Sequence, residues 1–177
     1  MRIIAGSCRG ARIFAPKGLD TRPTSDRARE AAFNLIGPVE GASVLDLYAG
    51  SGAMGLEALS RGAASAVFVE SDRDACGAIR RNLEKLRLGG AEVVCRDVLR
   101  FLAAERRRFD LILVDPPYDL LESLAMRLAV YLPPILAENG LVVVESSSRV
   151  EPQLETLEPR TSRRYGAARV TLFEGHA

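Results

Sequence analysis

The amino-acid sequence predicts an α/β protein with a doubly wound, mostly parallel β-sheet. From residue 42 onward, runs with strand character alternate with segments of helical periodicity. The strand-like runs are almost continuously apolar, as is typical of parallel strands that helices cover on both faces. The tail, residues 152–174, carries no good helical pattern and ends in the β-compatible run 168–173. We therefore expect the sheet to finish in an antiparallel hairpin along one edge.

The chain opens with two short β-compatible runs, residues 2–5 and 11–15, which the segment Gly6-Ser7-Cys8-Arg9-Gly10 separates. This pattern predicts a small N-terminal β-hairpin with a basic tip. Residues 1–30 carry seven basic and three acidic side chains, whereas the remainder carries 17 basic and 20 acidic ones. A basic segment on a near-neutral body is typical of a local phosphate-binding surface. Charge alone is equally compatible with an ordinary solvent-exposed face.

A helix is expected over residues 25–36. Ser25 suits the N-cap, and Asp26 suits the first turn, where a carboxylate interacts favourably with the helix dipole. One face is apolar at helical spacing and comprises Ala28, Ala32, Leu35 and Ile36. Gly37-Pro38 then ends the helix, because proline cannot continue the hydrogen-bond ladder.

The alternating part of the chain predicts five strands and four helices. The strands are Ser43–Leu47, Ser65–Glu70, Ala91–Cys95, Phe109–Val114 and Leu141–Glu145. The helices are Ala53–Arg61, Asp72–Leu88, Val98–Arg107 and Asp119–Tyr131, followed by a short turn near Pro133–Glu138. With the two strands of the tail, the sheet is expected to have seven strands.

Composition limits the class of protein. The 177 residues, 47% hydrophobic and 27% charged, indicate a soluble globular protein of one domain. No stretch approaches the roughly 18 apolar residues of a membrane span, and the N-terminus lacks a signal-peptide pattern, so we expect a cytoplasmic protein. Cys8, Cys76 and Cys95 are scattered and the single histidine is His176, so we expect no metal site. We expect Cys76 and Cys95 to fill the core.

A glycine-rich segment, Asp46–Gly55, follows the first strand of the alternating part and contains Gly50-x-Gly52-x-x-Gly55. Glu70 lies twenty residues after Gly50, at the end of the next strand. The glycines let a ligand approach the backbone, the following helix offers free N–H groups, and Glu70 would accept hydrogen bonds from ribose hydroxyls. An NAD enzyme and an enzyme that uses S-adenosylmethionine would both satisfy this pattern.

Carboxylates follow four successive strands, at Asp46, Glu70, Asp97 and Asp115. In an open α/β sheet, ligands bind at the carboxyl ends of the strands, so these acids are expected to line one edge. Each acid alone could be a helix N-cap. Together they favour the methyl donor over NAD, because Asp46 would repel a diphosphate but can hold a methionine ammonium. Asp97 stands where an adenine amine could donate to it.

The segment Asp115-Pro116-Pro117-Tyr118 forms a stiff loop directly after an apolar strand. It offers hydrogen-bond acceptors beside an aromatic face, a combination that suits a planar group with an NH2. The loop therefore points to chemistry on an exocyclic amine, for which a hydride-transfer enzyme has no obvious use. The alternative interpretation is a strand followed by a proline turn.

These motifs resemble the ordered motifs of class I S-adenosylmethionine-dependent methyltransferases that act on amino groups. They are Asp46–Gly55, Glu70, Asp97 and Asp115–Tyr118. The segments Arg22–Glu30 and Gly50–Arg61 resemble the RsmD family of bacterial 16S rRNA guanine-N2 methyltransferases. The resemblance runs from Arg2 to about Glu145 and is weaker in the tail. It implies a Rossmann-like fold, S-adenosyl-L-methionine as cofactor, and methyl transfer to a guanine amine of 16S rRNA.

The resemblance also implies roles for individual residues. Those that would hold the donor are Asp46, Ala49, Gly50, Ser51, Gly52, Gly55, Glu70, Ser71, Asp97 and Val98. Those that would bind and align the amine are Asp115, Pro116, Pro117 and Tyr118. Those that would contact RNA are Arg9, Arg12, Arg22, Thr24, Arg27 and Arg29. Arg29 could instead pair with a neighbouring acid on its own helix.

The resemblance further implies an RNA-facing extension over residues 1–40 and a methyltransferase domain over residues 41–177. The expected partner is 16S rRNA, within the 30S subunit or an assembly intermediate, and nothing in the sequence requires more than a monomer. Other hypotheses stay open: a DNA adenine-N6 or protein glutamine-N5 methyltransferase, an NAD-binding Rossmann protein, and a catalytically silent RNA-binding scaffold. The small size argues against a separate DNA-recognition domain, and the intact segment Asp115–Tyr118 argues against a scaffold.

Overall fold

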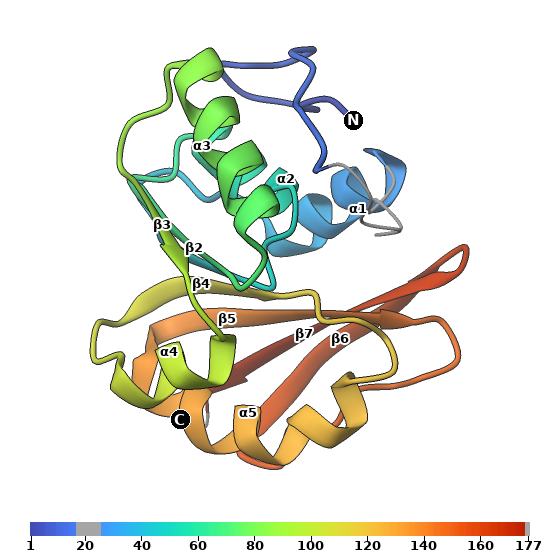
Figure 1. Cartoon of the computed structure of the whole chain (residues 1–177). Coiled ribbons are helices and arrows are strands. Elements are labelled where there is room, and N and C mark those ends of the chain that lie inside the picture. The colour runs from blue at the N-terminus through green and yellow to red at the C-terminus, as the bar shows by residue number, and fades with distance from the viewer. Residues whose placement is uncertain (17–25, 176–177) are drawn as a thin grey trace.

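The computed structural model describes residues 1–16 and 26–175, and Figure 1 shows how they are arranged. In chain order, the elements are α1 (Asp26–Ile36), β1 (Ser43–Leu47), α2 (Ala53–Ser60), β2 (Ser65–Glu70), α3 (Arg73–Leu86), β3 (Ala91–Cys95), α4 (Val98–Ala104), β4 (Phe109–Val114), α5 (Leu121–Ile135), β5 (Leu136–Ser147), β6 (Leu157–Tyr165) and β7 (Ala168–Gly175). The predicted bounds of β1 to β4 agree with the structure, and those of α1 to α4 differ only at the helix ends. Ser25, the predicted cap of α1, lies outside the described residues. Within the described ranges, no helix is long and apolar enough to cross a bilayer.

The strands form one seven-stranded sheet in the order β3-β2-β1-β4-β5-β7-β6. Strands β3, β2, β1, β4 and β5 run parallel, whereas β7 is antiparallel to β5 and β6 is antiparallel to β7. The predicted doubly wound sheet with an antiparallel edge hairpin is therefore confirmed. Since the chain runs outward from β1 toward β3 and then returns to β4, the switch point lies between β1 and β4.

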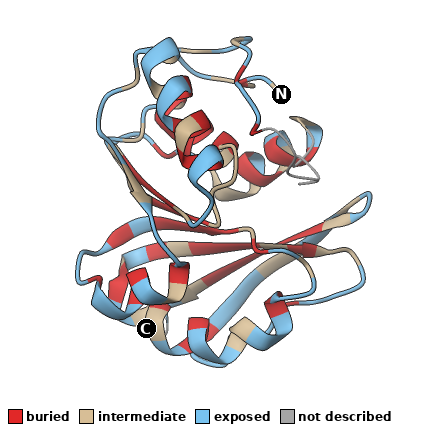
Figure 2. Ribbon diagram, in the orientation of Figure 1, coloured by how far each residue is buried: buried red, intermediate tan, exposed pale blue. Residues whose placement is uncertain are grey.

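Helices cover both faces of the sheet, with α1, α2 and α3 on one side and α4 and α5 on the other (Figure 1). Because successive strand residues point to opposite faces, neighbouring residues of β1 join different cores. Val44 packs into the core under α1, α2 and α3, and Leu45 packs into the core under α4 and α5. The buried residues accordingly gather along the central strands and the inward sides of the helices (Figure 2).

The end of α5 differs from the prediction. The helix continues to Ile135 with Pro133 and Pro134 in its last turn, and β5 begins at Leu136, where a turn was expected. Proline in a helix deprives the carbonyl four residues earlier of its N–H partner. For Pro133 that carbonyl, of Ala129, accepts a hydrogen bond from the Thr156 hydroxyl instead. A residue far along the chain thus lets the helix tolerate this proline.

The start of β5 is irregular. The ladder with β4 pairs Phe109 with Leu136 and then Leu111 with Leu141, so the intervening residues of β5 bulge outward. Asn139, in this bulge, has a φ of 60°. The regular part of the strand therefore begins near the predicted Leu141.

The N-terminal runs pair as predicted, but through a single antiparallel bridge between Arg2 and Arg12 rather than two full strands. The Ile3 N–H donates to the Ala11 carbonyl at 2.9 Å. Ile3 and Ile13 are buried in the same core as α1, α2 and α3. The hairpin is therefore fastened to the body of the protein. The domain boundary after residue 40 stays a prediction.

The cysteines follow the prediction in part. Cys76 of α3 is buried, as expected. Cys95 is exposed, so the expectation that it fills the core is wrong. The reason is its position, because it is the last residue of β3, the outermost strand on that side of the sheet.

Candidate active site

The glycine-rich segment after β1 turns the chain sharply into α2. Gly50 and Gly52 have φ of 54° and 77°, and the Gly52 N–H donates to the Ala49 carbonyl at 2.7 Å. A Cβ on Gly50 would meet no atom closer than 4.0 Å, so the backbone there is open to a ligand. A Cβ on Gly55 would lie 2.3 Å from the ring of Phe68. The segment thus combines a glycine that a ligand can approach with a glycine that seats α2 on the sheet.

Asp46, near the end of β1, is only 2% exposed. Its Oδ2 accepts a hydrogen bond from the Gly55 N–H at 2.9 Å, at the start of α2. Burial raises the pKa of Asp46 to about 7; the Gly55 hydrogen bond opposes this rise, and the charge of Glu70 adds to it. A cationic ligand group would favour the ionised form of such a carboxyl, so Asp46 fits the ammonium of a methionine.

Glu70, at the end of β2, joins the glycine-rich segment to the next loop. Its Oε2 accepts a hydrogen bond from the Gly50 N–H at 2.9 Å, and its Oε1 accepts one from the Asp72 N–H at 2.9 Å. The exposed Ser71 hydroxyl lies 3.4 Å from Oε1. Glu70 is half-buried, and its carboxylate lies beside the open backbone of Gly50. A ribose that is bound over the glycine-rich segment would contact the carboxylate there.

Asp97, after β3, caps α4. Its Oδ1 accepts a hydrogen bond from the Arg100 N–H at 3.0 Å, and its side chain is exposed. The adjacent Val98 is buried, 3% exposed. The N-cap interpretation therefore holds for Asp97, and a contact of this carboxylate with adenine stays a prediction.

The loop after β4 lies beside the end of β1. The Asp115 N–H donates to the Leu47 carbonyl at 3.4 Å. Asp115 is half-buried, Pro116 is buried and Pro117 is exposed. The half-buried Tyr118 donates its hydroxyl to Glu145 Oε1 at 3.5 Å. The structure thus brings the predicted amine-binding loop next to the glycine-rich segment, since both leave the sheet where β1 and β4 end.

Strand β5 supplies an acid that the sequence analysis did not assign. Glu145 is half-buried and lines a small pocket together with Asp115. The other walls are mostly apolar and include Ala32, Met54 and Val170. The signal was present in the sequence, because Glu145 is a fifth acid at the end of a fifth predicted parallel strand.

The strand order divides the carboxyl edge of the sheet into two halves. On one side of the switch point, Asp46 lies near the end of β1, Glu70 ends β2 and Asp97 follows β3. On the other side, Asp115 follows β4, and Glu145 lies in β5 two residues before the strand ends at Ser147. We call these the donor half and the acceptor half. Among the described residues, no group of three or more His, Cys, Asp or Glu side chains could hold a metal ion.

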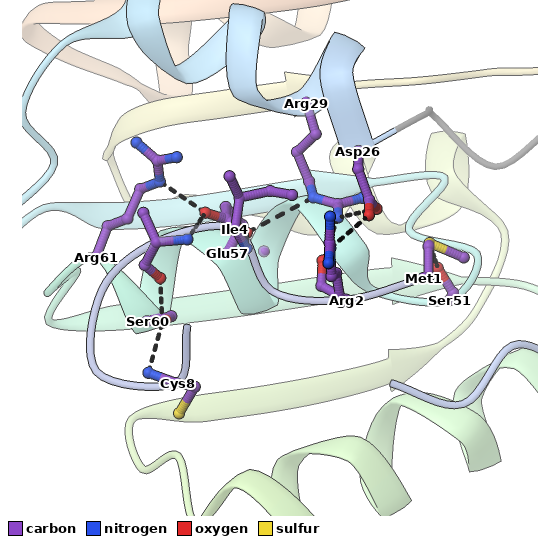
Figure 3. Close-up of polar contacts among 12 residues, drawn as sticks. Met1, Arg2, Ile4, Cys8, Asp26, Arg29, Ser51, Glu57, Ser60 and Arg61 are labelled. Carbon is purple, nitrogen blue, oxygen red and sulfur yellow. Dashed lines mark hydrogen bonds and ion pairs between the residues drawn. The ribbon is translucent and has the colours of Figure 1, made fainter. Parts of the chain in front are cut away.

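Glu57 of α2 fastens the N-terminal segment to the helix that follows the glycine-rich segment. Its fully buried carboxylate accepts hydrogen bonds from the Ile4 N–H at 2.8 Å and the Ala5 N–H at 3.0 Å. Arg61 Nε lies 2.8 Å from Oε1, and Arg29 Nε lies 3.6 Å from Oε2. Figure 3 shows Glu57 between these two guanidinium groups. A buried carboxylate is stable only when its charge and lone pairs are satisfied, as they are here.

The predicted RNA contacts fall into three groups. Arg9, Arg12 and Arg27 are exposed and available to a partner. Arg22 and Thr24 lie outside the described residues. Arg29 is buried, which contradicts the expectation that it lies on the RNA-binding surface.

The burial of Arg29 has a clear physical cause. Its guanidinium pairs with Asp26 at 3.0 Å, three residues earlier on α1, and also faces Glu57. It donates a further hydrogen bond to the Arg2 carbonyl. The alternative interpretation, that Arg29 pairs with an acid on its own helix, is therefore supported, and Arg29 acts inside the protein.

Asn82 of α3 joins the second run of the hairpin to the glycine-rich segment. Its fully buried amide accepts a hydrogen bond from the Phe14 N–H at 2.7 Å and donates to the Phe14 carbonyl at 2.9 Å. It also donates to the Ser51 carbonyl at 3.4 Å. One turn later, Lys85 donates to the Arg12 carbonyl at 2.6 Å. The roles of Asn82 and Glu57 were not predicted from the sequence, because a single polar residue in a helix pattern carries no signal of a distant partner.

Comparison with known proteins agrees with this geometry. The family model described as conserved hypothetical protein 95 matches residues 1–174. The ribosomal RNA small subunit methyltransferase D of Escherichia coli (strain K12) is 40% identical over 158 residues, covering 88% of this chain and 76% of that protein. The provisionally named rRNA methyltransferase YlbH of Bacillus subtilis (strain 168) is 40% identical over 156 residues, 85% of each chain.

A solved structure is also closely similar. The provisionally named methyltransferase yhhF from Escherichia coli matches with a TM-score of 0.85 at 37% identity, covering 100% of this chain and 98% of that one. The resemblance that the motifs predicted is therefore confirmed. This chain belongs to the conserved hypothetical protein 95 family, the RsmD family.

Proposed function

We propose that this protein transfers the methyl group of S-adenosyl-L-methionine to the exocyclic N2 of a guanine in bacterial 16S rRNA. Membership of the RsmD family supports the reaction class. The observation that carries the proposal is the contact of the Asp115 N–H with the Leu47 carbonyl, at 3.4 Å. This contact joins the loop that we propose to bind the amine to the segment that we propose to bind the cofactor.

The donor half suits S-adenosyl-L-methionine. The open backbone at Gly50 would receive the ligand, Asp46 would face its ammonium, and Glu70 would accept from its ribose hydroxyls. Asp97, with the N–H of Val98, would meet the adenine. When bound, the cofactor supplies an electrophilic methyl group on a sulfonium. The residues of this half orient that methyl toward the acceptor half.

The acceptor half aligns the amine. The guanine N2 lone pair is delocalised into the ring, so orientation has to supply much of the rate, up to about 7–11 kcal/mol in favourable cases. The carboxylate of Asp115 and the carbonyl of Pro116 would accept the two N–H bonds. The N–C bond forms as the C–S bond breaks, and the C–S electron pair stays on sulfur. The methylated nitrogen would then release its proton, which the carboxylate of Asp115 could accept.

Tyr118 would stack on the target base in this arrangement. Stacking on an aromatic side chain contributes roughly 1–3 kcal/mol per base and offsets part of the cost of extruding the base from its neighbours. Pro117, exposed beside it, would contact the same base from the loop.

The RNA substrate would dock on the N-terminal extension, residues 1–40. Arg9, Arg12 and Arg27 are exposed there and can contact phosphates. Sequence-specific RNA recognition favours unpaired bases, so the target is a loop of 16S rRNA. We propose a monomeric enzyme that acts in the cytoplasm on the 30S subunit or an assembly intermediate.

The test offers labelled S-adenosyl-L-methionine and the protein to 30S subunits, free 16S rRNA and duplex DNA from cells that lack the enzyme. Nucleoside analysis of the labelled product identifies the methylated atom. We expect N2-methylguanosine in 16S rRNA. Methylated adenosine, labelled DNA, labelled ribosomal protein, or no label in rRNA would overturn the proposal.

A further inference from the structure

We propose that Glu145 is a specificity-determining residue, which accepts a hydrogen bond from N1–H of the target guanine. This inference rests on the proposed function, because it concerns the base whose N2 is methylated. It assigns to Glu145 the distinction between guanine and purines that lack a proton on N1.

Glu145 lies beside Asp115 near the carboxyl edge of the sheet, within β5, where it pairs with Val170 of β7. The parallel ladder pairs Val114 of β4 with Val144 of β5, so the residues that come next along the two segments, Asp115 and Glu145, are neighbours. Both carboxylates line the same small pocket. An amine that is held at Asp115 therefore belongs to a base whose neighbouring atoms lie toward Glu145.

The loop that binds the amine also orients Glu145. The Tyr118 hydroxyl donates to Glu145 Oε1 at 3.5 Å. The Glu145 side chain is half-buried among the apolar atoms of Ala32, Met54 and Val170, where a hydrogen bond to a charged group is stronger than in water. The base-stacking residue and the proposed N1 acceptor are thus set relative to each other before the base arrives.

The chemistry of guanine matches two adjacent carboxylates. On its Watson–Crick edge, guanine presents N1–H next to the N2 amine, so two donor groups lie side by side. Asp115 would accept from N2, and Glu145 would accept from N1–H. Adenine and 2-aminopurine instead carry an unprotonated N1, whose lone pair would face the carboxylate of Glu145. A site that is built to accept an N–H group discriminates against an analogue without it, because the carboxylate then loses that hydrogen bond and faces a lone pair instead.

The experiment compares two rRNA substrates, assembled from fragments, that carry guanine or 2-aminopurine at the target position. Both bases have the reactive N2 amine, but only guanine has N1–H. Single-turnover rates are measured for the wild type, for Glu145→Gln, and for the control Glu174→Gln. Glu174 pairs with Leu141, toward the opposite end of β5, and is therefore remote from the pocket.

We expect the wild type and Glu174→Gln to methylate 2-aminopurine about 30-fold more slowly than guanine. In Glu145→Gln this ratio should fall to about threefold or less, because an amide can accept from N1–H or donate to an unprotonated N1. The ratio within one preparation cancels any loss of folded protein. Intrinsic differences between the two amines cancel in the comparison between variants.

A second measurement does not depend on turnover. The fluorescence of 2-aminopurine rises when the base unstacks, so a titration gives the affinity for the modified rRNA. We expect Glu145→Gln to bind this rRNA several-fold more tightly than the wild type does. A wild type that methylates both substrates equally, or a Glu145→Gln variant with an unchanged ratio, would overturn the inference. Both of these results differ from the result expected if the proposed function is wrong, because guanine itself would then receive no methyl group.

Discussion

Arg29 of α1 and Glu57 of α2 face each other across 3.6 Å with both side chains fully buried. The same carboxylate accepts the N–H groups of Ile4 and Ala5. The Glu57 carboxylate therefore joins three segments of the chain: the N-terminal hairpin, helix α1, and helix α2, which follows the glycine-rich segment. We infer that the proposed RNA-facing extension and the cofactor segment are held in one rigid arrangement through Glu57.

Replacement of Glu57 by alanine should destabilise the protein by about 3–5 kcal/mol, because it removes one of the two carboxylates that face the buried Arg29 guanidinium and leaves two N–H groups without an acceptor. Arg61→Ala is the matched control. Arg61 contacts the same carboxylate but its side chain is 20% exposed, so its loss should cost about 1 kcal/mol. Urea denaturation of both variants provides the measurement. Equal losses for the two variants would show that Glu57 is not the centre of the network.

Replacement of Asn82 by alanine should loosen the second run of the hairpin around Phe14. The Phe14 N–H and carbonyl both lose their partner, at about 1–3 kcal/mol for each group that stays buried. Hydrogen exchange should become faster at the Phe14 amide and in the adjoining residues, while the central strands keep their protection. Arg81→Ala, an exposed neighbour on α3, should leave exchange at Phe14 unchanged. Unchanged exchange in the Asn82 variant would contradict the account.

The pKa of Asp46, which burial raises to about 7, predicts a pH-dependent affinity for the donor. The cationic methionine end should bind the ionised carboxyl, which is scarce at lower pH. The affinity for the donor should therefore rise by up to tenfold per pH unit between about pH 5.5 and 7. In this range the α-amino group of the donor stays protonated, because its pKa is higher. Calorimetry across this range measures the effect. Asp46→Asn should bind more weakly at pH 7 and show a flat profile; a wild type with a flat profile would contradict the role of Asp46.

Glu105 should stabilise the protein at neutral pH and not in acid. Hydrogen bonds from Arg107 lower the pKa of Glu105 from 4.5 to about 2, with smaller contributions from the N–H groups of Arg107 and Arg106 against an opposing effect of burial. Because the folded pKa lies below the unfolded one, this stabilisation is complete above about pH 4.5 and is lost as the pH falls toward 2.

Glu105→Gln should accordingly lower the free energy of unfolding by about 1–2 kcal/mol at pH 7. The expected loss is modest because the Arg107 side chain is half-exposed, so that water screens its interaction with Glu105. At pH 2.5 most of this difference should have disappeared. Glu155→Gln, at an exposed position, serves as the control and should have little effect at either pH. A constant difference between pH 7 and 2.5 would exclude a charge-based role for Glu105.

The central fold could be predicted from the sequence because its signals are local. Each of the strands β1 to β4 is a mostly apolar run that a loop or a helix start follows at once, so their bounds agreed with the structure. The acids at the strand ends were predictable for the same reason. In a parallel sheet, position along the chain alone assigns the last residue of each strand to one edge.

The errors arose where a distant residue decides the outcome. The extent of α5 depends on the Thr156 hydroxyl, which accommodates the helical proline through the Ala129 carbonyl. The burial of Arg29 depends on Glu57, which lies on another helix. Glu145 was missed for a different reason. It becomes a candidate only when the strand order places it beside Asp115.

The division of the carboxyl edge into donor and acceptor halves is tested most directly with Asp115→Ala. The measurement pairs the calorimetric affinity for S-adenosyl-L-methionine with the single-turnover rate of methyl transfer to 16S rRNA. If Asp115 only aligns the amine, transfer should fall by at least about 100-fold while donor affinity stays within about threefold of the wild type. Loss of both donor binding and transfer would contradict the account, because Asp115 would then belong to the cofactor site.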